Sequence, residues 1–286
     1  MTHVTIVEMS PRDGLQNEKR TVPTADKIRL VDMASACGFE RIEAASFVSP
    51  RWVPQMADAA EVLAGIDRRP GTRYAALTPN AKGLEAAIEA RADEVAIFGS
   101  ASEAFSKANI NCTIAESLER FGPVVERARQ VGLPVRGYIS CVVACPYSGP
   151  VEPASVADLA ARLLALGCYE VSLGDTIGAG TPDTVGAMLD AVLPLVPAHL
   201  LAGHYHDTNG RALDNIEASL ARGLRVFDAS LGGLGGCPYA PGAKGNVDTI
   251  AVCDRLDRLG YRAGLDPARL AEAAAFALSL IHISEP

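Results

Sequence analysis

Residues 200–208 read Leu-Leu-Ala-Gly-His-Tyr-His-Asp-Thr, and the rest of the chain is organised around this stretch. Its apolar start is typical of a buried strand, and residues i and i+2 of a strand point to the same face. We therefore expect His204 and His206 to project together, with Tyr205 turned away. Two imidazoles on one face make up part of a metal site, which then needs one or two oxygen ligands. The alternative is a pair of polar residues that closes a strand.

Short apolar runs alternate with longer amphipathic stretches along the whole chain. Repeated β-then-α units require parallel strands joined by right-handed crossovers. Eight units, with no Gly-x-Gly-x-x-Gly turn after the first strand, favour a closed (β/α)8 (TIM) barrel over an open doubly wound sheet. The expected strands are Val4–Val7, Arg41–Ser46, Arg73–Leu77, Glu94–Phe98, Val135–Ser140, Glu170–Leu173, Leu200–His204 and Arg225–Ala229. The expected helices are Ala25–Cys37, Met56–Ile66, Ala81–Ala92, Ser117–Val131, Ser155–Leu166, Pro182–Val196, Ala212–Arg222 and Val247–Leu259.

The end of the chain departs from this alternation. Residues 266–280 read as an additional C-terminal helix, and the helical periodicity is lost over Ser-Leu-Ile-His-Ile-Ser-Glu-Pro at 279–286. We expect a single α/β catalytic domain over residues 1–278. Residues 279–286 are interpreted as an atypical tail that is foreign or truncated.

Composition excludes several classes of protein. The chain has 286 residues and a net charge of −8, and nucleic-acid binding needs a basic face. No apolar run reaches about 18 residues, so no membrane span is expected. The N-terminus has neither a basic region nor a long apolar region, so we see no signal peptide. Seven scattered cysteines suit a reducing cytoplasm better than a disulfide framework.

Polar residues cluster where the predicted strands end. In a (β/α)8 barrel, catalytic groups lie at the carboxyl ends of the strands and in the loops that follow. Asp13 follows the first strand, Glu43 lies in the second, and Asp175 follows the sixth. His204 ends the seventh strand, and Cys237 lies in a glycine-rich loop after the eighth. We therefore expect these side chains to meet at one mouth of the barrel.

Each of these residues has a structural alternative. Asp13 would complete a face of two histidines and one carboxylate for a metal ion, or it is a turn residue before Gly14. Arg12 would donate to an oxyanion, or it forms a surface ion pair. Glu43 and Asp175 would orient a metal ligand or Arg12, or they cap helices.

The glycine-rich loop 232–246 carries two further candidates. Cys237 is a candidate proton donor or acceptor, although a single cysteine is more often inert packing. Asn246 would add a neutral oxygen ligand to the metal, cap the helix that begins at Val247, or do both. Lys244 is the only cation in the loop, so phosphate binding is less favoured.

The chain resembles the 3-hydroxy-3-methylglutaryl-CoA (HMG-CoA) lyase family, which belongs to the aldolase-like metal-dependent lyase barrels. Arg-Asp-Gly-x-Gln and His-x-His are shared with the wider superfamily, whereas Gly-Gly-Cys-Pro-Tyr-Ala and the segment 105–112 are more specific to the lyases. Tyr205 and Asn209 depart from the residues familiar at these positions. The resemblance covers residues 11–18, 43–50, 105–112, 174–178, 204–208 and 235–240.

The resemblance implies cleavage of HMG-CoA to acetyl-CoA and acetoacetate, in leucine degradation and ketone-body formation, with Mg²⁺ or Mn²⁺ as cofactor. It implies an acyl-CoA substrate as the partner, no nucleic acid or membrane, and a homo-oligomer, either a dimer or a tetramer. It matches Asp13, His204, His206 and Asn246 to the metal ligands. The expected catalytic residues are Arg12, Asp13, Glu43, Asp175, His204 and Cys237, and the expected substrate contacts are Arg12, Gln16, Lys107 and Asn109.

Three alternatives stay open at this point. One is a lyase for a related 3-hydroxy-3-carboxyalkyl-CoA ester. Another is a Claisen-type synthase that joins an acyl-CoA to a 2-oxo acid. The third is a metal-binding barrel without catalytic activity.

Overall fold

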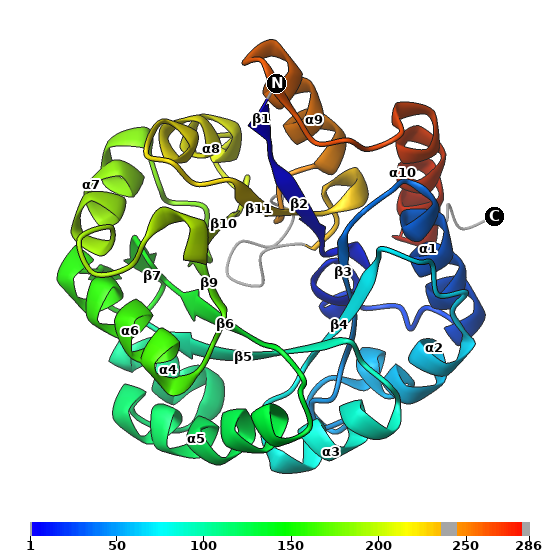
Figure 1. The fold of residues 1–286 in the computed structure, drawn as a ribbon, viewed down its shortest axis with the longest axis horizontal. Coiled ribbons are helices and arrows are strands. Elements are labelled where there is room, and N and C mark those ends of the chain that lie inside the picture. Colours follow the sequence, from blue (N-terminus) through cyan, green and yellow to red (C-terminus); the bar gives the residue numbers. More distant parts are fainter. Residues whose placement is uncertain (1, 236–244, 282–286) are drawn as a thin grey trace.

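A closed barrel of parallel strands forms the centre of the molecule (Figure 1). The computed structural model describes residues 2–235 and 245–281. The strands follow one another around the barrel in the order β10-β11-β2-β3-β4-β5-β6-β9, and the expected (β/α)8 fold is therefore confirmed. They are β2 (Thr5–Glu8), β3 (Arg41–Ser46), β4 (Arg73–Leu77), β5 (Glu94–Ser100), β6 (Val135–Ser140), β9 (Glu170–Asp175), β10 (Leu201–Tyr205) and β11 (Val226–Ala229).

A ring of helices covers the outside of the barrel (Figure 1). The largest apolar cluster joins the strands to these helices. Within the described ranges, no helix is both long and apolar enough to cross a membrane. The helices are α1 (Thr24–Ala36), α2 (Ala59–Gly65), α3 (Ala81–Glu89), α4 (Glu103–Ile110), α5 (Ile114–Gln130), α6 (Pro153–Leu166), α7 (Pro182–Val192), α8 (Ala212–Ala221), α9 (Thr249–Arg258) and α10 (Pro267–Ile281).

In the part of the chain that the structure describes, four short strands lie outside the barrel. β1 (Thr2–His3) pairs in parallel with β12 (Tyr261–Arg262), beside the start of the chain. β7 (Ala144–Cys145) and β8 (Gly149–Pro150) form an antiparallel hairpin in the loop between β6 and α6.

The inside of the barrel holds paired charges. Arg136 on β6 donates to Asp228 on β11 at 2.8 Å, and Arg41 on β3 donates to Glu170 on β9 at 2.8 Å. Neither pair belongs to neighbouring strands, so both hydrogen bonds cross the barrel interior. All four residues are buried. An unpartnered charge at such depth is costly, so these residues depend on one another.

The structure differs from the predicted elements at several places. α4 was not expected: its N-cap is Ser102, and it buries only Phe105 and Ser106, so its apolar periodicity is too short to recognise. The hairpin of β7 and β8 was not expected either. α10 continues to Ile281 and Leu280 is buried, so residues 279–281 belong to the helix rather than to the tail. Residues 282–286 lie outside the described residues.

Candidate metal centre and active site

β10 carries two imidazoles at the barrel rim. His204 lies in the strand and His206 directly follows its last residue. Tyr205 points the other way, toward the helices, where its hydroxyl lies 2.8 Å from Oγ of Ser219 on α8. The alternation of side chains along a strand therefore turns both histidines to the same side.

Asp13 is held by a π-helical turn, η1 (Ser10–Gly14), that directly follows β2. The amide of Gly14 donates to the carbonyl of Met9 at 3.0 Å, which closes the wide turn. Gly14 has to lack a side chain, because a Cβ atom there would lie 2.9 Å from Cβ of Leu234. Single π-helical turns are rare in proteins, and those that occur are often found at functional sites. This one places two consecutive reactive residues, Arg12 and Asp13, at the rim.

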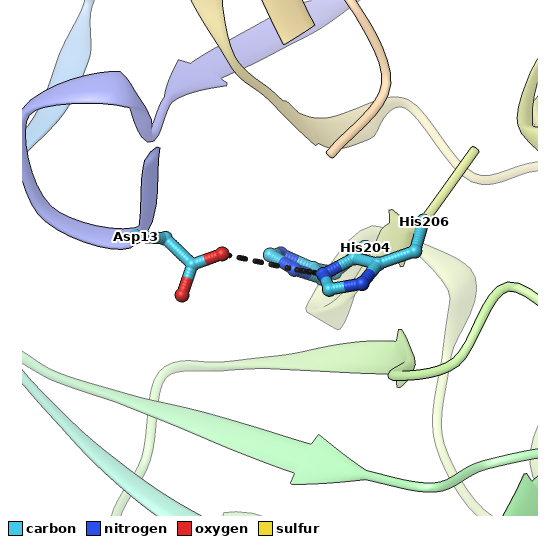
Figure 2. Close-up of side chains that lie close together, drawn as sticks. All are labelled: Asp13, His204 and His206. Carbon is cyan, nitrogen blue, oxygen red and sulfur yellow. Dashed lines mark hydrogen bonds and ion pairs between the residues drawn. The ribbon is translucent and has the colours of Figure 1, made fainter. Parts of the chain in front are cut away.

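Asp13, His204 and His206 converge on one point (Figure 2). Each offers one ligand atom, and these three atoms lie within 4.8 Å of one another. The Nε2 atoms of the two histidines are 3.3 Å apart, and Oδ2 of Asp13 is 3.8 Å from Nε2 of His204. Two imidazole nitrogens and one carboxylate oxygen suit a divalent cation that keeps open positions for water or substrate. The donor set therefore fits such an ion.

The surroundings of Asp13 and His206 shift the pKa values of both side chains toward the forms that bind a cation. Burial alone would raise the pKa of Asp13, but the positive charges of Arg12, His204 and His206 lower it to about 2. Burial, together with the charge of His204, lowers the pKa of His206 to about 4. At neutral pH the centre thus holds an ionised carboxylate and an uncharged imidazole of His206, which are the forms that bind metals.

Asn246 reaches the same carboxylate from the other side. Its Nδ2 atom donates to Oδ2 of Asp13 at 2.8 Å and to the carbonyl of Leu234 at 3.1 Å. It does not cap α9, because Asp248 has that role and accepts a hydrogen bond from the amide of Ala251. Of the two roles considered for Asn246, the helix cap is thus excluded.

Arg12 is fixed between two carboxylates. Its Nε donates to Glu43 at 2.5 Å and its Nη1 donates to Asp13 at 2.5 Å. Tyr138 donates to the second oxygen of Glu43. Burial would lower the pKa of Arg12, but Glu43 and Asp13 raise it, so the side chain stays charged. Among the described residues its Nη2 makes no hydrogen bond, and Arg12 lines the cavity beside the metal centre.

This cavity has a volume of about 910 Å³ and is lined by the candidate metal ligands Asp13, His204 and His206. Gln16 also lines it, and its buried Oε1 has no hydrogen-bond partner among the described residues. Asn109 lies in the lining as well.

Lys107 is exposed and does not line the cavity, so the structure does not support the expected contact with substrate. Arg120 and Trp52 are among the lining residues that were not singled out from the sequence. No sequence signal marked them, because each is one polar or aromatic residue in an otherwise ordinary stretch.

Among the described residues, the carboxylate of Asp175 makes no hydrogen bond to the candidate ligands, although its backbone carbonyl accepts from the amide of His206 at 3.4 Å. Its two carboxylate oxygens accept from the amides of Ala179 and Gly180, at 3.1 and 2.7 Å, and they shape the loop after β9. Thr181, not Asp175, caps α7. The register of the strands explains these contacts. Asp175 is paired with Tyr205 on the neighbouring strand, so both side chains point to the same side of the sheet, toward the helices. The expected role of Asp175 in orienting Arg12 or a ligand stays a prediction, which the hydrogen bonds of its carboxylate do not support.

Cys237 and Lys244 lie outside the described residues. The expected part of Cys237 in proton transfer stays a prediction.

The sequence analysis missed the residues behind His204. Asp228 accepts from Nδ1 of His204 at 3.0 Å and also binds Arg136 and Ser172. The available signal was a charged or polar residue at alternate positions of an apolar strand, as in Arg136-x-Tyr138. That signal shows which face such residues share, but not their partners.

The fold and the site define a class of protein: a (β/α)8 barrel with a carboxylate and two imidazoles gathered for a divalent cation at its carboxyl-terminal rim. The chain belongs to the HMGL-like family, whose model matches residues 3–277.

Characterised relatives resemble the chain over almost its full length. It is 59% identical over 270 residues to the 3-hydroxy-3-isohexenylglutaryl-CoA/hydroxy-methylglutaryl-CoA lyase of Pseudomonas aeruginosa, with 94% of this chain and 90% of that protein covered. The crystal structure of the HMG-CoA lyase from Brucella melitensis matches with a TM-score of 0.98 at 66% identity, covering 99% of this chain and 100% of the other. An HMG-CoA lyase from Acinetobacter baumannii, solved in complex with coenzyme A and 3-methylmalate, matches with a TM-score of 0.92 at 38% identity, covering 98% and 91%.

Proposed function

We propose that the chain is a carbon–carbon lyase that cleaves HMG-CoA to acetyl-CoA and acetoacetate with Mg²⁺ or Mn²⁺. One observation carries this proposal: three candidate metal ligands, Asp13, His204 and His206, converge at one cavity. The guanidinium of Arg12 lines the same cavity. Relatives at more than half identity bear the name of this activity. The products would place the reaction in leucine degradation and ketone-body formation.

Asp13, His204 and His206 would hold the cation, with Asn246, which already contacts Asp13, as the fourth protein ligand. When bound, the cation would lower the pKa of the substrate's tertiary hydroxyl, which has to lose its proton as the adjacent carbon–carbon bond breaks.

Arg12 has the task of stabilising negative charge. The departing carbon becomes the enolate of a thioester, so charge grows on the thioester oxygen. A preorganised donor at such an oxygen contributes a few kcal/mol to catalysis, because it needs no reorganisation during the reaction. Glu43 holds the Nε edge of Arg12, which leaves Nη2 for the substrate. Gln16 is a further candidate for a substrate contact, because its Oε1 is unpartnered among the described residues.

Two proton transfers complete the reaction: one removes the hydroxyl proton, and one delivers a proton to the enolate carbon. His204 and Cys237 are the candidate carriers. His204 lines the cavity, and Cys237 belongs to the glycine-rich loop that follows β11. Solvent-isotope and pH–rate measurements on the two single variants would assign the base and the acid.

The test is coupled detection of acetoacetate from HMG-CoA, with and without a chelator. We expect turnover that the chelator removes and that added Mn²⁺ restores. Thiol release from acetyl-CoA and a 2-oxo acid, without HMG-CoA cleavage, would instead indicate a synthase. Bound metal with no turnover on any ester would indicate a non-catalytic barrel and contradict the proposal.

A second substrate is favoured by the apolar residues in the lining of the cavity. They include Val48, Leu77, Phe98 and Ile139, which suit an alkyl group larger than methyl on the hydroxyl-bearing carbon. The Pseudomonas relative is named for an isohexenyl ester as well as for the methyl ester. Comparing kcat/KM for the two esters tests this extension, and a preference for the methyl ester above about 10³-fold would reject it.

A cytoplasmic location and a dimeric or tetrameric state are part of the same proposal. Free thiols support a reducing compartment, and six are described: Cys37, Cys112, Cys141, Cys145, Cys168 and Cys253. Sedimentation velocity of the purified chain would give the oligomeric state.

A further inference from the structure

A buried carboxylate lies directly behind one candidate metal ligand. Asp228 on β11 is 1% exposed, and its Oδ2 atom is 3.0 Å from Nδ1 of His204. Ser172 donates to the same oxygen at 2.8 Å, and Arg136 donates to the other oxygen at 2.8 Å. Asp228 is not among the residues that line the cavity, and it reaches the candidate metal ligands through His204.

The protonation of this pair follows from its partners. The guanidinium of Arg136 lies 2.8 Å from one oxygen of Asp228, and this charge-assisted hydrogen bond favours the ionised carboxylate. An ionised carboxylate can only accept hydrogen bonds, so Nδ1 of His204 has to carry a hydrogen. In the uncharged imidazole the other nitrogen, Nε2, then keeps its lone pair. That nitrogen is the one that faces Asp13 and His206.

Arg136 connects Asp228 to the rest of the site. Its three nitrogens each have a different partner: Nη2 donates to Asp228, Nε to Glu170 at 2.8 Å, and Nη1 to the hydroxyl of Tyr138 at 2.9 Å. Tyr138 in turn donates to Glu43, which holds Arg12. An unbroken series of hydrogen bonds thus joins His204 to Arg12 through the barrel interior.

We propose that Asp228 and Arg136 are positioning residues of the lyase: Asp228 holds His204 in the Nδ1–H tautomer with Nε2 aimed at the cation, and Arg136 holds both Asp228 and, through Tyr138 and Glu43, the guanidinium of Arg12. The metal-binding part of this inference rests on the proposed function. The tautomer of His204 is a property of the metal-free chain and does not rest on it.

The first experiment measures that tautomer. Nitrogen-15 NMR of the metal-free wild type distinguishes the two ring nitrogens, and the loss of one set of signals in His204→Gln assigns them. At an alkaline pH, where the imidazole of His204 is uncharged, we expect a protonated Nδ1 and an unprotonated Nε2. A protonated Nε2 in the uncharged imidazole of the wild type would overturn the proposal without any reference to metal or activity.

The second experiment uses Asp228→Asn, whose amide can present a hydrogen-bond donor to Nδ1 and so favour the wrong tautomer. We expect the Nε2–H form, and Mn²⁺ affinity, followed by the EPR signal of free Mn²⁺, reduced about 10- to 100-fold. Ser172→Ala is the matched control, because it removes one hydrogen bond to the same oxygen and leaves the carboxylate. It should keep the tautomer and lose less than about fivefold in affinity.

Tyr138→Phe tests the second half of the proposal, because it breaks the link to Glu43 and leaves Asp228 and His204 in contact. We expect Mn²⁺ affinity within about twofold of the wild type and a kcat that falls without a matching change in KM, since Arg12 loses its support in the transition state. Unchanged kcat in Tyr138→Phe, or unchanged Mn²⁺ affinity and tautomer in Asp228→Asn, would contradict the corresponding half. A wild type that binds no Mn²⁺ would instead reject the proposed metal site.

Discussion

Asp13 lies 3.8 Å from Nε2 of His204 and also accepts a hydrogen bond from Arg12, its neighbour in the chain. The carboxylate of Asp13 is therefore both a candidate metal ligand and a support for Arg12, whose guanidinium faces the substrate. Substitution of a metal ligand and substitution of Arg12 should therefore affect Mn²⁺ affinity and turnover differently. This difference separates metal binding from charge stabilisation.

Asp13→Ala and His204→Ala remove one candidate ligand each. We expect HMG-CoA cleavage to fall by at least about 10³-fold, because the lost metal supplies several kcal/mol of transition-state stabilisation. Mn²⁺ binding, measured on the same samples, should be lost in parallel. Near-wild-type rates in either variant would reject the metal model.

Arg12→Gln should have the opposite pattern. The three candidate ligand atoms stay in place, so Mn²⁺ affinity should change little, whereas kcat should fall by about 10²- to 10³-fold because the enolate loses its charged donor. Steady-state kinetics and Mn²⁺ EPR on one preparation give both values. Full activity would remove Arg12 from the mechanism, and loss of Mn²⁺ would show that its main task is to hold Asp13.

Glu8 makes stability depend on pH. Its carboxylate is fully buried and accepts from the amides of Ser10 and Leu231 and from the hydroxyl of Thr249. Burial raises its pKa from 4.5 to about 7. Because the folded state holds the proton more tightly than the unfolded state, the contribution to stability is complete below pH 4.5 and is lost as the pH rises through 7.

The free energy of unfolding should therefore fall by about 3 kcal/mol over this range on account of Glu8. Urea denaturation of Glu8→Gln, which cannot ionise, should show a pH dependence smaller by that amount than the wild type. Parallel pH profiles for the two proteins would show that Glu8 does not titrate in this range.

Gly178 and Gly210 form a matched pair, because both have a left-handed φ, of +62° and +68°. Alanine at either position costs about 1–2 kcal/mol in backbone strain. Only at Gly178 would the new Cβ also collide, at 2.9 Å from the carbonyl oxygen of His206 and 2.8 Å from Cβ of Thr208, whereas Gly210 has open space.

We therefore expect Gly178→Ala to lose about 1–3 kcal/mol more than Gly210→Ala in thermal or urea unfolding. It should also bind Mn²⁺ more weakly, because the backbone of His206 has to shift. Equal stability and equal Mn²⁺ affinity in the two variants would show that the loop after β9 adapts without moving the metal centre.

Much of the fold was predictable because it depends on local patterns. The alternation of strands and helices predicted the barrel, and the spacing of His204 and His206 predicted that they share a face. The position of Asp13 after the first strand predicted its place at the rim. By contrast, the contacts of the Asp175 carboxylate with the loop after β9 were not predicted, because the predicted strand ended at Leu173 and the register that turns Asp175 toward the helices was not apparent.

The sequence by itself determined which residue types end the strands, and parallel strands bring all such ends to one rim. Only the tertiary structure decided that Asp228 lies behind His204 and that Arg136 reaches across to hold it. His204 and Asp228 are paired in register on the neighbouring strands β10 and β11, whereas Arg136 comes from β6, which is not a neighbour of β11. These contacts depend on the register of the strands and on how the sheet closes, and no local spacing in the sequence gives either.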